Sequence, residues 1–339
     1  MPSISFSFDN FCQSGCARII MLGNPRVTRL AGIINPERVV PATLKVVDIA
    51  GLVKGASKGE GLGNQFLSNI REVDAIAHVV RCFEDNGVAH VENNHDPVGD
   101  VIIVQTELIL SDLEQVERKI EKLHKQIKGD HDLAEELSVF ENIRNHLGEG
   151  NPAISANLDT DEKLIIGELN LLSMKPYIFI ANVSEDQLKE ASDSEKQLRK
   201  FAFQEGVEVI PICAKVESEL SELDEEESDY FTEELGIDGT GIDQLTNSGY
   251  RMLEQITYFT AGKNEVRAWE IRKGATAPEA AGKIHTDFEK GFIRAEVVPY
   301  EDLIQWRSLA ESRKRGVLRQ EVKDYIVKDG DIMHVLFNV

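Results

Sequence analysis

The stretch Val46-Val47-Asp48-Ile49-Ala50-Gly51 indicates the fold, because an extended apolar run ends here at an aspartate and passes directly into loop residues. Residues 43–47 are apolar and β-branched enough to form a buried strand. The loop that follows is rich in glycine, a residue that adds little packing. Flexibility or close approach of the backbone to a ligand is therefore the expected reason for its glycines at Gly51, Gly55, Gly59, Gly61 and Gly63.

The segments that follow this loop continue an alternation of helix and strand. Residues 64–73 can form a helix, and residues 75–83 form a second apolar run, so the unit is β-loop-α-β. Two further apolar runs, 177–181 and 207–213, each follow a helical stretch. This order predicts an α/β fold with a doubly wound, mostly parallel sheet and helices on both faces. Ligands are then expected at the carboxyl ends of the strands.

A long insertion separates the second and third of these strands. Its apolar residues recur at spacings of four and three, which is the heptad pattern of a coiled coil: Ile109, Leu113, Val116, Ile120, Leu123 and Ile127. A second amphipathic stretch follows Gly129 and carries Leu133, Leu137, Phe140, Ile143 and Leu147. We expect a helical hairpin that buries its own seam. The alternative is a helix that dimerises with a second chain.

The last part of the chain, from about residue 256, has a different pattern. Residues 266–271 and 292–298 alternate between apolar and polar side chains, and residues 277–284 can form a helix. The end of the chain predicts a hairpin that turns at Lys328-Asp-Gly. A small mixed α+β module is expected.

The charge of the chain is unevenly distributed. The net charge is −22, but from Ile256 onward there are 14 Lys and Arg against 13 Asp and Glu, so the earlier residues carry the acidity. The acidic run 217–229 is read as a solvated face. Four scattered cysteines form no disulfide framework, and neither a signal peptide nor an apolar run of about 18 residues is present. A length of 339 residues predicts two or three domains. The composition predicts a cytoplasmic protein that makes no contact with a membrane.

Asp48 and Gly51 have the residue types that phosphohydrolases place at the end of such a strand. An aspartate there holds Mg²⁺ through water, and the glycine offers a backbone amide to the γ-phosphate. Leu52 follows, where many GTPases have a glutamine that orients the attacking water. Leucine cannot do this, so either other groups position the water or the loop switches without efficient turnover.

The end of the third strand, Asn182-Val183-Ser184-Glu185, lies where a base-reading motif is expected. Guanine readers have Asn-Lys-x-Asp there, so Val183 and Glu185 do not predict strong selection of guanine. An asparagine-initiated turn with a capping carboxylate explains this segment equally well. Ala214, after the fourth strand, can offer a backbone amide to a base. The phosphate-binding motif Gly-x4-Gly-Lys-[Ser/Thr] is absent from the sequence.

Long stretches of the chain resemble the YchF-type, Obg-like ATPases, a branch of the P-loop GTPases that associates with ribosomes. The resemblance covers roughly residues 27–339 and rests on residues 35–41, 47–67, 70–83, 258–269, 284–297 and 337–339. It implies a P-loop NTPase-like G domain, an inserted coiled-coil domain and a C-terminal TGS domain with a β-grasp fold. The expected boundaries are 1–100 and 171–255 for the two parts of the G domain, 101–170 for the coiled coil and 256–339 for the TGS domain.

The resemblance also implies an activity and its site residues. Members bind and hydrolyse ATP with Mg²⁺, use GTP less well, and couple nucleotide to movement of the switch loop. Asn182, Val183 and Glu185 match the family's base motif, and Leu52 matches its hydrophobic replacement of glutamine. The implied partners are the ribosome or its RNA, and the expected state is a monomer.

The chain departs from the family at its start. The first strand, the Gly-x-Pro-Asn-Val-Gly-Lys-Ser loop and the following helix are missing, and Gln13 stands where a threonine reaches Mg²⁺. The family pattern resumes abruptly near Pro25-Arg26, which predicts a mis-assigned start or residues read from a shifted frame. We expect a sheet without its first strand. The family implies an ATPase, and the alternative is a non-catalytic ribosome- or RNA-binding protein that uses the coiled-coil and TGS surfaces.

Overall fold

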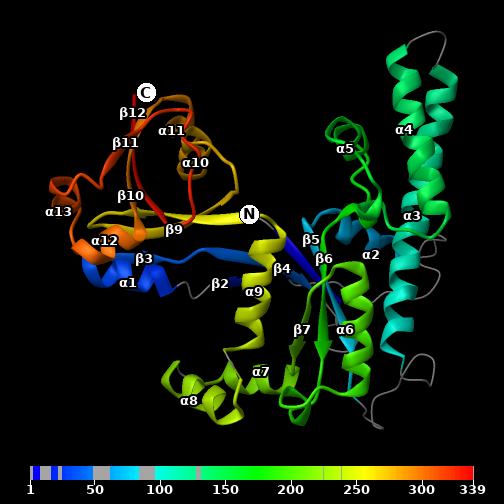
Figure 1. The fold of residues 1–339 in the computed structure, drawn as a ribbon, viewed down its shortest axis with the longest axis horizontal. Helices are drawn as coiled ribbons and strands as arrows, with labels where there is room; N and C mark the ends of the chain where they lie inside the picture. Colours follow the sequence, from blue (N-terminus) through cyan, green and yellow to red (C-terminus); the bar gives the residue numbers. More distant parts are fainter. Residues whose placement is uncertain are drawn as a thin grey trace. The chain divides into compact units, whose positions relative to one another are not determined.

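The computed structural model describes residues 3–7, 17–21, 25–48, 62–83, 96–126, 131–223, 225–237 and 239–338. The chain divides into two compact units (Figure 1). One unit holds Ile19–Lys45 and Thr246–Val339, and the other holds Pro2–Arg18 and Val46–Leu245. The described strands form two six-stranded sheets; the first has most of its residues in the unit that holds Val46–Leu245, and the other sheet lies in the unit that holds Thr246–Val339.

The first sheet has the strand order β2-β4-β1-β5-β6-β7. Its strands are β1 (Ser3–Ser7), β2 (Ala17–Met21), β4 (Thr43–Asp48), β5 (Ala75–Arg81), β6 (Tyr177–Asn182) and β7 (Val209–Ile212). The pairs β1/β5, β5/β6 and β6/β7 are all parallel. The predicted α/β fold with a mostly parallel sheet is confirmed.

The expectation that this sheet lacks its first strand is wrong. Ser3–Ser7 forms β1 and lies between β4 and β5, paired in parallel with β5 from Ile4 opposite Ala75 to Ser7 opposite His78. The segment Ser-Ile-Ser-Phe-Ser alternates polar and apolar residues, as a strand requires. Without it, the edges of β4 and β5 would leave backbone N–H and C=O groups unpaired, so an extended segment is stabilised there by main-chain hydrogen bonds.

The helices of this unit are α2 (Leu62–Arg71), α3 (Pro97–Gln126), α4 (His131–Gly148), α5 (Thr160–Gly167), α6 (Asp193–Glu205), α7 (Ala214–Leu220) and α8 (Glu225–Leu235). Short 3₁₀ helices, η2 (Ala153–Ser155), η3 (Leu172–Met174) and η4 (Asp186–Leu188), link several of them. One core joins α3 and α6 to the sheet, through Val101, Leu198, Val80 and Phe179. None of the helices in the described ranges is long and apolar enough to cross a membrane.

The helical hairpin predicted for the insertion is confirmed. Helices α3 and α4 run side by side (Figure 1), and their heptad residues form one buried cluster that includes Val116, Ile120, Leu123, Phe140 and Ile143. The seam is therefore buried within one chain. Ile127, the last seam residue expected on the first arm, lies outside the described residues.

The other unit contains α1 (Pro25–Ile34) and a sheet with the order β11-β10-β12-β8-β9-β3. Its strands are β3 (Arg38–Val40), β8 (Gln255–Ala261), β9 (Glu265–Arg272), β10 (Phe292–Pro299), β11 (Arg319–Glu321) and β12 (Asp331–Phe337). Helix α9 (Gly241–Met252) precedes β8, and α10 (Ala277–Ile284), α11 (Thr286–Lys290), α12 (Tyr300–Trp306) and α13 (Leu309–Lys314) follow β9. Residues of α10 pack against β8 and β10 through Ala281, Tyr258 and Val297.

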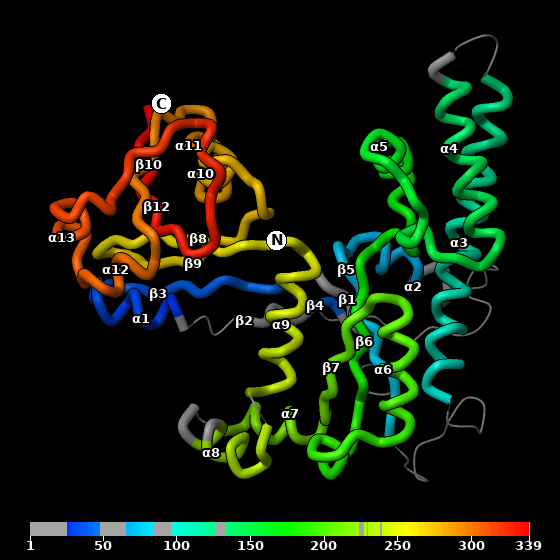
Figure 2. The backbone as a smooth tube through the Cα atoms, viewed as in Figure 1, coloured from blue at the N-terminus to red at the C-terminus, as the bar shows by residue number. Residues whose placement is uncertain are grey.

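The hairpin predicted at the end of the chain is only half right. The turn is present, since Asp331 N donates to Lys328 O at 3.1 Å and Gly330 has a φ of 86°. The residues before the turn form no named strand and make a single bridge, Thr276 with Ile326. Strand β12 pairs instead with β10, antiparallel, and with β8, parallel (Figure 2).

Candidate functional site

The carboxyl ends of three neighbouring strands lie side by side in the first sheet. Arg81 at the end of β5 is opposite Asn182 at the end of β6, and Asn182 is opposite Ile212 at the end of β7. In open α/β sheets, ligands bind beyond this edge. The arrangement brings the predicted base-reading segment of β6 beside the residues that follow β7.

Backbone hydrogen bonds fix the first residues of the base-reading segment. Cys82 N donates to Asn182 O at 2.8 Å, and Val183 N donates to Ile212 O at 3.0 Å. The side chain of Val183 is buried. The chain then turns into η4, where Ser184 N donates to Gln187 Oε1 at 2.8 Å. Val183 is thus held by the core of the sheet, and Glu185 reaches the surface.

Residues after β7 complete this edge of the sheet. Ala214 begins α7 directly after Ile212 and Cys213, and Lys215 Nζ lies 3.9 Å from Glu185 Oε2 and 3.9 Å from Glu219 Oε1. The structure therefore brings Asn182, Val183, Glu185 and Ala214 together, as the sequence predicted. The ion pairs of Lys215 are exposed, so each contributes little to stability and leaves the Glu185 carboxylate able to meet a ligand.

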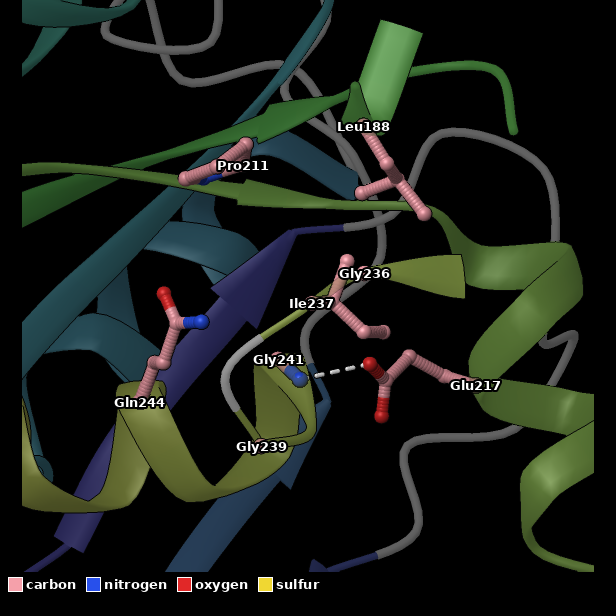
Figure 3. A pocket seen from close by; sticks show the side chains of 8 residues that line it. All are labelled: Leu188, Pro211, Glu217, Gly236, Ile237, Gly239, Gly241 and Gln244. Atoms are coloured by element: carbon pink, nitrogen blue, oxygen red, sulfur yellow. Dashed lines mark hydrogen bonds between the residues drawn. The ribbon is translucent and has the colours of Figure 1, made fainter. Parts of the chain in front are cut away.

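A cavity of about 220 Å³ adjoins this segment at Leu188, the last residue of η4 (Figure 3). Its lining includes the apolar side chains of Leu188, Pro211 and Ile237 and the polar side chains of Glu217 and Gln244. Glycines at 236, 239 and 241 form the rest of the wall. The cavity is therefore partly apolar, with one carboxylate at its edge.

Glu217 closes one side of this cavity and was not predicted as a site residue. Its Oε1 accepts a hydrogen bond from Gly241 N at 2.6 Å, at the start of α9. Burial raises the pKa of the Glu217 carboxyl, and the backbone N–H groups of Gly241 and Ile242 oppose that rise. A Cβ at position 241 would lie 2.8 Å from Glu217 Oε1 and 2.9 Å from Ile212 Cγ1, so a larger residue there would require both side chains to shift.

The expectation that the acidic run 217–229 is a solvated face is therefore wrong for Glu217. Its partner lies 24 residues further along the chain. The charge pattern alone indicated an acidic stretch. The signal that could have identified this contact is the Thr-Gly pair at residues 240–241, which is typical of a helix start, where free backbone N–H groups attract a carboxylate.

The phosphate side of the predicted site lies largely outside the described residues. Asp48 ends β4, but nothing is described of its side chain. Gly63 lies in the first turn of α2. Gly51, Leu52, Gly55, Gly59 and Gly61 are outside the described residues, as is Gln13, so their roles stay predictions. Within the part of the chain that the structure does describe, no group of three or more His, Cys, Asp or Glu side chains could hold a metal ion.

Comparisons with known proteins match both units. The model described as "50S ribosome-binding GTPase" (MMR_HSR1) matches residues 19–128, and the YchF-GTPase_C model, described as "Protein of unknown function (DUF933)", matches residues 255–338. The chain is 49% identical over 322 residues to the "Ribosome-binding ATPase YchF" of Escherichia coli O157:H7, covering 95% of this chain and 88% of that protein. It is 46% identical over 324 residues to the protein of that name from Bacillus subtilis strain 168, with the same coverage. The solved Schizosaccharomyces pombe YchF GTPase superposes with a TM-score of 0.89 at 33% identity, over 99% of this chain and 97% of that one.

Proposed function

Because this chain belongs to the YchF family, we propose that it is a cytoplasmic, ribosome-associated protein of the type that binds and hydrolyses ATP and uses GTP less well, with nucleotide binding dependent on a phosphate-binding loop. The observation that carries this proposal is the 49% identity to a named ribosome-binding ATPase across 95% of the chain. We propose that the protein acts as a monomer. The coiled-coil seam supports this, since α3 and α4 cover it within one chain.

The base side of the site supports a preference for adenine. Guanine readers have Asn-Lys-x-Asp, whose aspartate accepts hydrogen bonds from N1 and N2. Here Val183 stands in place of the lysine and Glu185 in place of the aspartate. We assign Asn182 and Glu185 to the edge of the base, with Val183, whose side chain is buried in the core, holding this segment in place. The N–H of Ala214, at the start of α7, is assigned to the base as a donor.

The phosphate side is assigned to Asp48 and the loop after it. Asp48 would hold Mg²⁺ through water, Gly51 would offer its amide to the γ-phosphate, and the glycines up to Gly63 would allow the loop to move. Leu52 would shield the site without orienting water. Mg²⁺ supplies charge neutralisation between the phosphates when it is bound.

A second candidate function has its own support in the sequence. The sequence contains no Gly-x4-Gly-Lys-[Ser/Thr], and preorganised charge stabilisation is usually the largest catalytic contribution. This favours a non-catalytic protein that binds ribosomes or RNA through the coiled-coil and C-terminal surfaces. The two candidates differ in whether nucleotide binds at all.

Titration with a fluorescent ATP analogue and Mg²⁺ separates these candidates. We expect no saturable binding by the chain as it stands, and binding once a Gly-x-Pro-Asn-Val-Gly-Lys-Ser loop and a helix are inserted after β1. In that longer protein, Glu185→Gln should weaken ATP binding about tenfold or more, because a charged acceptor is lost. Glu190→Gln is the matched control, an exposed carboxylate five residues further on that should have no effect.

Two outcomes would contradict these assignments. Binding by the unextended chain would show that the phosphate loop is dispensable. Absence of binding by the extended chain would refute nucleotide binding and favour the non-catalytic candidate. Co-sedimentation with ribosomes over a series of salt concentrations tests the partner, because contacts to phosphate weaken steeply as salt rises.

A further inference from the structure

Helix α3 connects two cores of the unit that contains the first sheet. It is a single helix of 30 residues. Val101, near its start, packs in the core of the sheet, whereas Val116 packs in the seam of the hairpin. Between these two residues, Leu108 packs in a further cluster with Phe66 and Ile70 of α2. Helix α2 therefore contacts α3 at the point where α3 leaves the sheet and enters the hairpin (Figure 1).

The side chain at the end of α2 is bound to α3 by hydrogen bonds. Arg71, the last residue of α2, donates from Nη1 to Gln115 Oε1 at 2.5 Å and from Nη2 to Ser111 Oγ at 3.2 Å. The amide of Gln115 also donates, from Nε2 to Leu169 O at 2.6 Å. Ser111 and Gln115 are four residues apart, so they lie on one face of α3. A planar guanidinium that meets two acceptors on one helix face is fixed in direction as well as in position.

The backbone at the end of α2 is held by a buried cation. Lys175 is 9% exposed, and its Nζ donates to Arg71 O at 3.2 Å and to Val73 O at 2.6 Å. Its third donor is directed to Asn170 Oδ1 at 3.0 Å, so every N–H of the ammonium is used. Asn170 Nδ2 in turn donates to Arg71 O at 2.9 Å. A positive charge at the carbonyl end of a helix stabilises that end.

The segment that supplies Lys175 is itself fixed to α3. Asp112 is fully buried, and its carboxylate accepts from Leu172 N at 2.8 Å and from both Ser173 N and Ser173 Oγ at 2.7 Å. Asn170 has a left-handed φ of 45°, which a residue other than glycine keeps only where its surroundings hold it. We call the residues that join the two helices in this way the α2–α3 node: Arg71, Ser111, Asp112, Gln115, Asn170 and Lys175.

We propose that the α2–α3 node couples α2 to the helical hairpin, so that a displacement of α2 reorients α3 and α4, and a partner that moves the hairpin displaces α2. The C-terminal end of α2 is a fixed joint, because its side chain and its backbone are both bonded there. Since α3 is one continuous helix, a tilt at Gln115 is carried to its end at Gln126, about 16 Å further on. Coupling through such a joint acts in both directions.

This inference rests on the proposed function for what displaces α2. Helix α2 begins at Leu62, directly after the glycine-rich loop to which the phosphate contacts are assigned, so a bound nucleotide would act on the N-terminal end of this helix. The hairpin would respond at the other end of the coupled structure. The coupling itself requires neither a nucleotide nor a partner, so it can be measured in the chain as it stands.

Hydrogen exchange of the full chain, read by mass spectrometry, tests the joint without altering the sequence of α2. Gln115→Ala removes one acceptor of Arg71, so exchange in α2 should rise about tenfold, the effect of losing a hydrogen bond to a charged group. Arg118→Ala is the matched control, because Arg118 is 67% exposed and its carboxylate partner, Glu114, lies on the same helix. This variant should leave α2 unchanged. Exchange in α6, in the same unit, should change in neither variant.

Phe140→Ala tests the coupling from the hairpin side. Phe140 is fully buried in the seam and lies outside the α2–α3 node, so its truncation loosens the hairpin directly. Exchange in α2 should rise about fivefold when Phe140→Ala is made in the wild-type chain, and should not rise further when it is added to Gln115→Ala. A contact that only stabilises α2 locally would not transmit the change in α4.

Several results would overturn the coupling. Gln115→Ala could leave exchange in α2 unchanged, or Arg118→Ala could raise it equally. The effect of Phe140→Ala on α2 could be absent, or of the same size with and without Gln115. An increase in α6 as large as that in α2 would also overturn the proposal, because the node would then contribute only to the stability of the whole unit.

ATP and Mg²⁺, added to the protein that carries the inserted phosphate-binding loop, separate this inference from the proposed function. Nucleotide binding that changes exchange in α4 of the wild type, but not of Gln115→Ala, supports both. Nucleotide binding with no change in α4 overturns the coupling and leaves the proposed function standing. Absence of nucleotide binding, with Phe140→Ala still raising exchange in α2, refutes the proposed function and leaves the coupling standing.

Discussion

His78 shows how the interior of the first unit restricts the charge of a single residue. It lies on β5, with its ring centre 5.9 Å from that of Phe179, and lines a cavity of about 30 Å³ with Gln105 and Tyr177. Burial lowers the pKa of His78 to about 4 and raises the pKa of Tyr177 to about 12. Gln105 lies 3.3 Å from the Tyr177 hydroxyl and donates to it. Both rings are therefore neutral in the folded chain near pH 7.

The neutral state of His78 predicts a specific pH dependence of stability. Its folded pKa lies below the ordinary value of 6.5, so its contribution is complete above pH 6.5 and is lost as pH falls toward about 4. His78→Gln removes this titration but not that of the carboxylates. Over that range, the wild-type free energy of unfolding should fall faster than that of the variant, by up to about 1.4 kcal/mol per pH unit.

Urea unfolding of the two proteins near pH 7, 5.5 and 4, in the same buffers, measures this difference. His285→Gln is the control, since His285 is an exposed histidine of the C-terminal unit. Parallel curves of unfolding free energy against pH for wild type and His78→Gln would contradict this prediction, because they would show that protonation of His78 does not destabilise the fold.

Elements whose pattern is local were predictable from the sequence. The heptad spacing from Ile109 onward predicted α3 and α4, because the seam residues of a hairpin lie close together in the chain. The strand that ends at Asp48 and the strand that ends at Asn182 were predicted for the same reason, as compact apolar runs. On the base side of the site, parallel strand order was enough to place Asn182 beside Ala214.

Elements that depend on distant partners were not predictable in this way. Asp112 lies in the heptad run but is fully buried, and it accepts hydrogen bonds from Leu172 N at 2.8 Å and Ser173 N at 2.7 Å. Those donors are about 60 residues away in the chain. Strand β1 and the cap that Glu217 makes on α9 depend on distant partners in the same way. Each forms because the folded chain would otherwise leave backbone N–H or C=O groups without a hydrogen bond.

The buried seam predicts the cost of truncating one of its side chains. Phe140 on α4 is fully buried, so Phe140→Ala should lower the free energy of unfolding of the hairpin by about 3 kcal/mol. Leu164→Ala, in which a side chain that is 71% exposed is removed, is the control and should stay within about 0.5 kcal/mol. Urea unfolding followed by far-UV circular dichroism measures both.

The same experiment distinguishes a hairpin from a dimerising helix. A seam buried within one chain gives an unfolding midpoint that does not change with protein concentration, whereas a seam between two chains gives a midpoint that rises with it. Equal losses in Phe140→Ala and Leu164→Ala, or a midpoint that rises with concentration, would contradict the intramolecular seam.

At the scale of the whole molecule, chain order and compact units do not coincide. Residues 19–45 belong to the same unit as residues 246–339. Within that unit, β3 pairs in parallel with β9, and Arg26 Nη1 donates to Asp329 Oδ2 at 2.7 Å. The three predicted domain boundaries stay predictions, but this early segment is packed with the C-terminal residues. About 200 residues separate the two segments in sequence, so composition and periodicity, which are local, could not indicate that they belong to one unit.

This division predicts separate unfolding transitions, and the two tryptophans allow them to be distinguished. Both, Trp269 and Trp306, lie in the unit that contains residues 246–339, so tryptophan fluorescence reports on that unit alone. Leu30 on α1 is fully buried in the same unit. Leu30→Ala should therefore lower the free energy of the fluorescence-detected transition by about 3 kcal/mol, while Phe140→Ala, in the other unit, leaves that transition unchanged.

Arg29→Ala, which alters an exposed residue of the same helix, is the control for Leu30→Ala. If both core variants shift the fluorescence transition equally, the units unfold as one cooperative structure and the division does not describe their energetics.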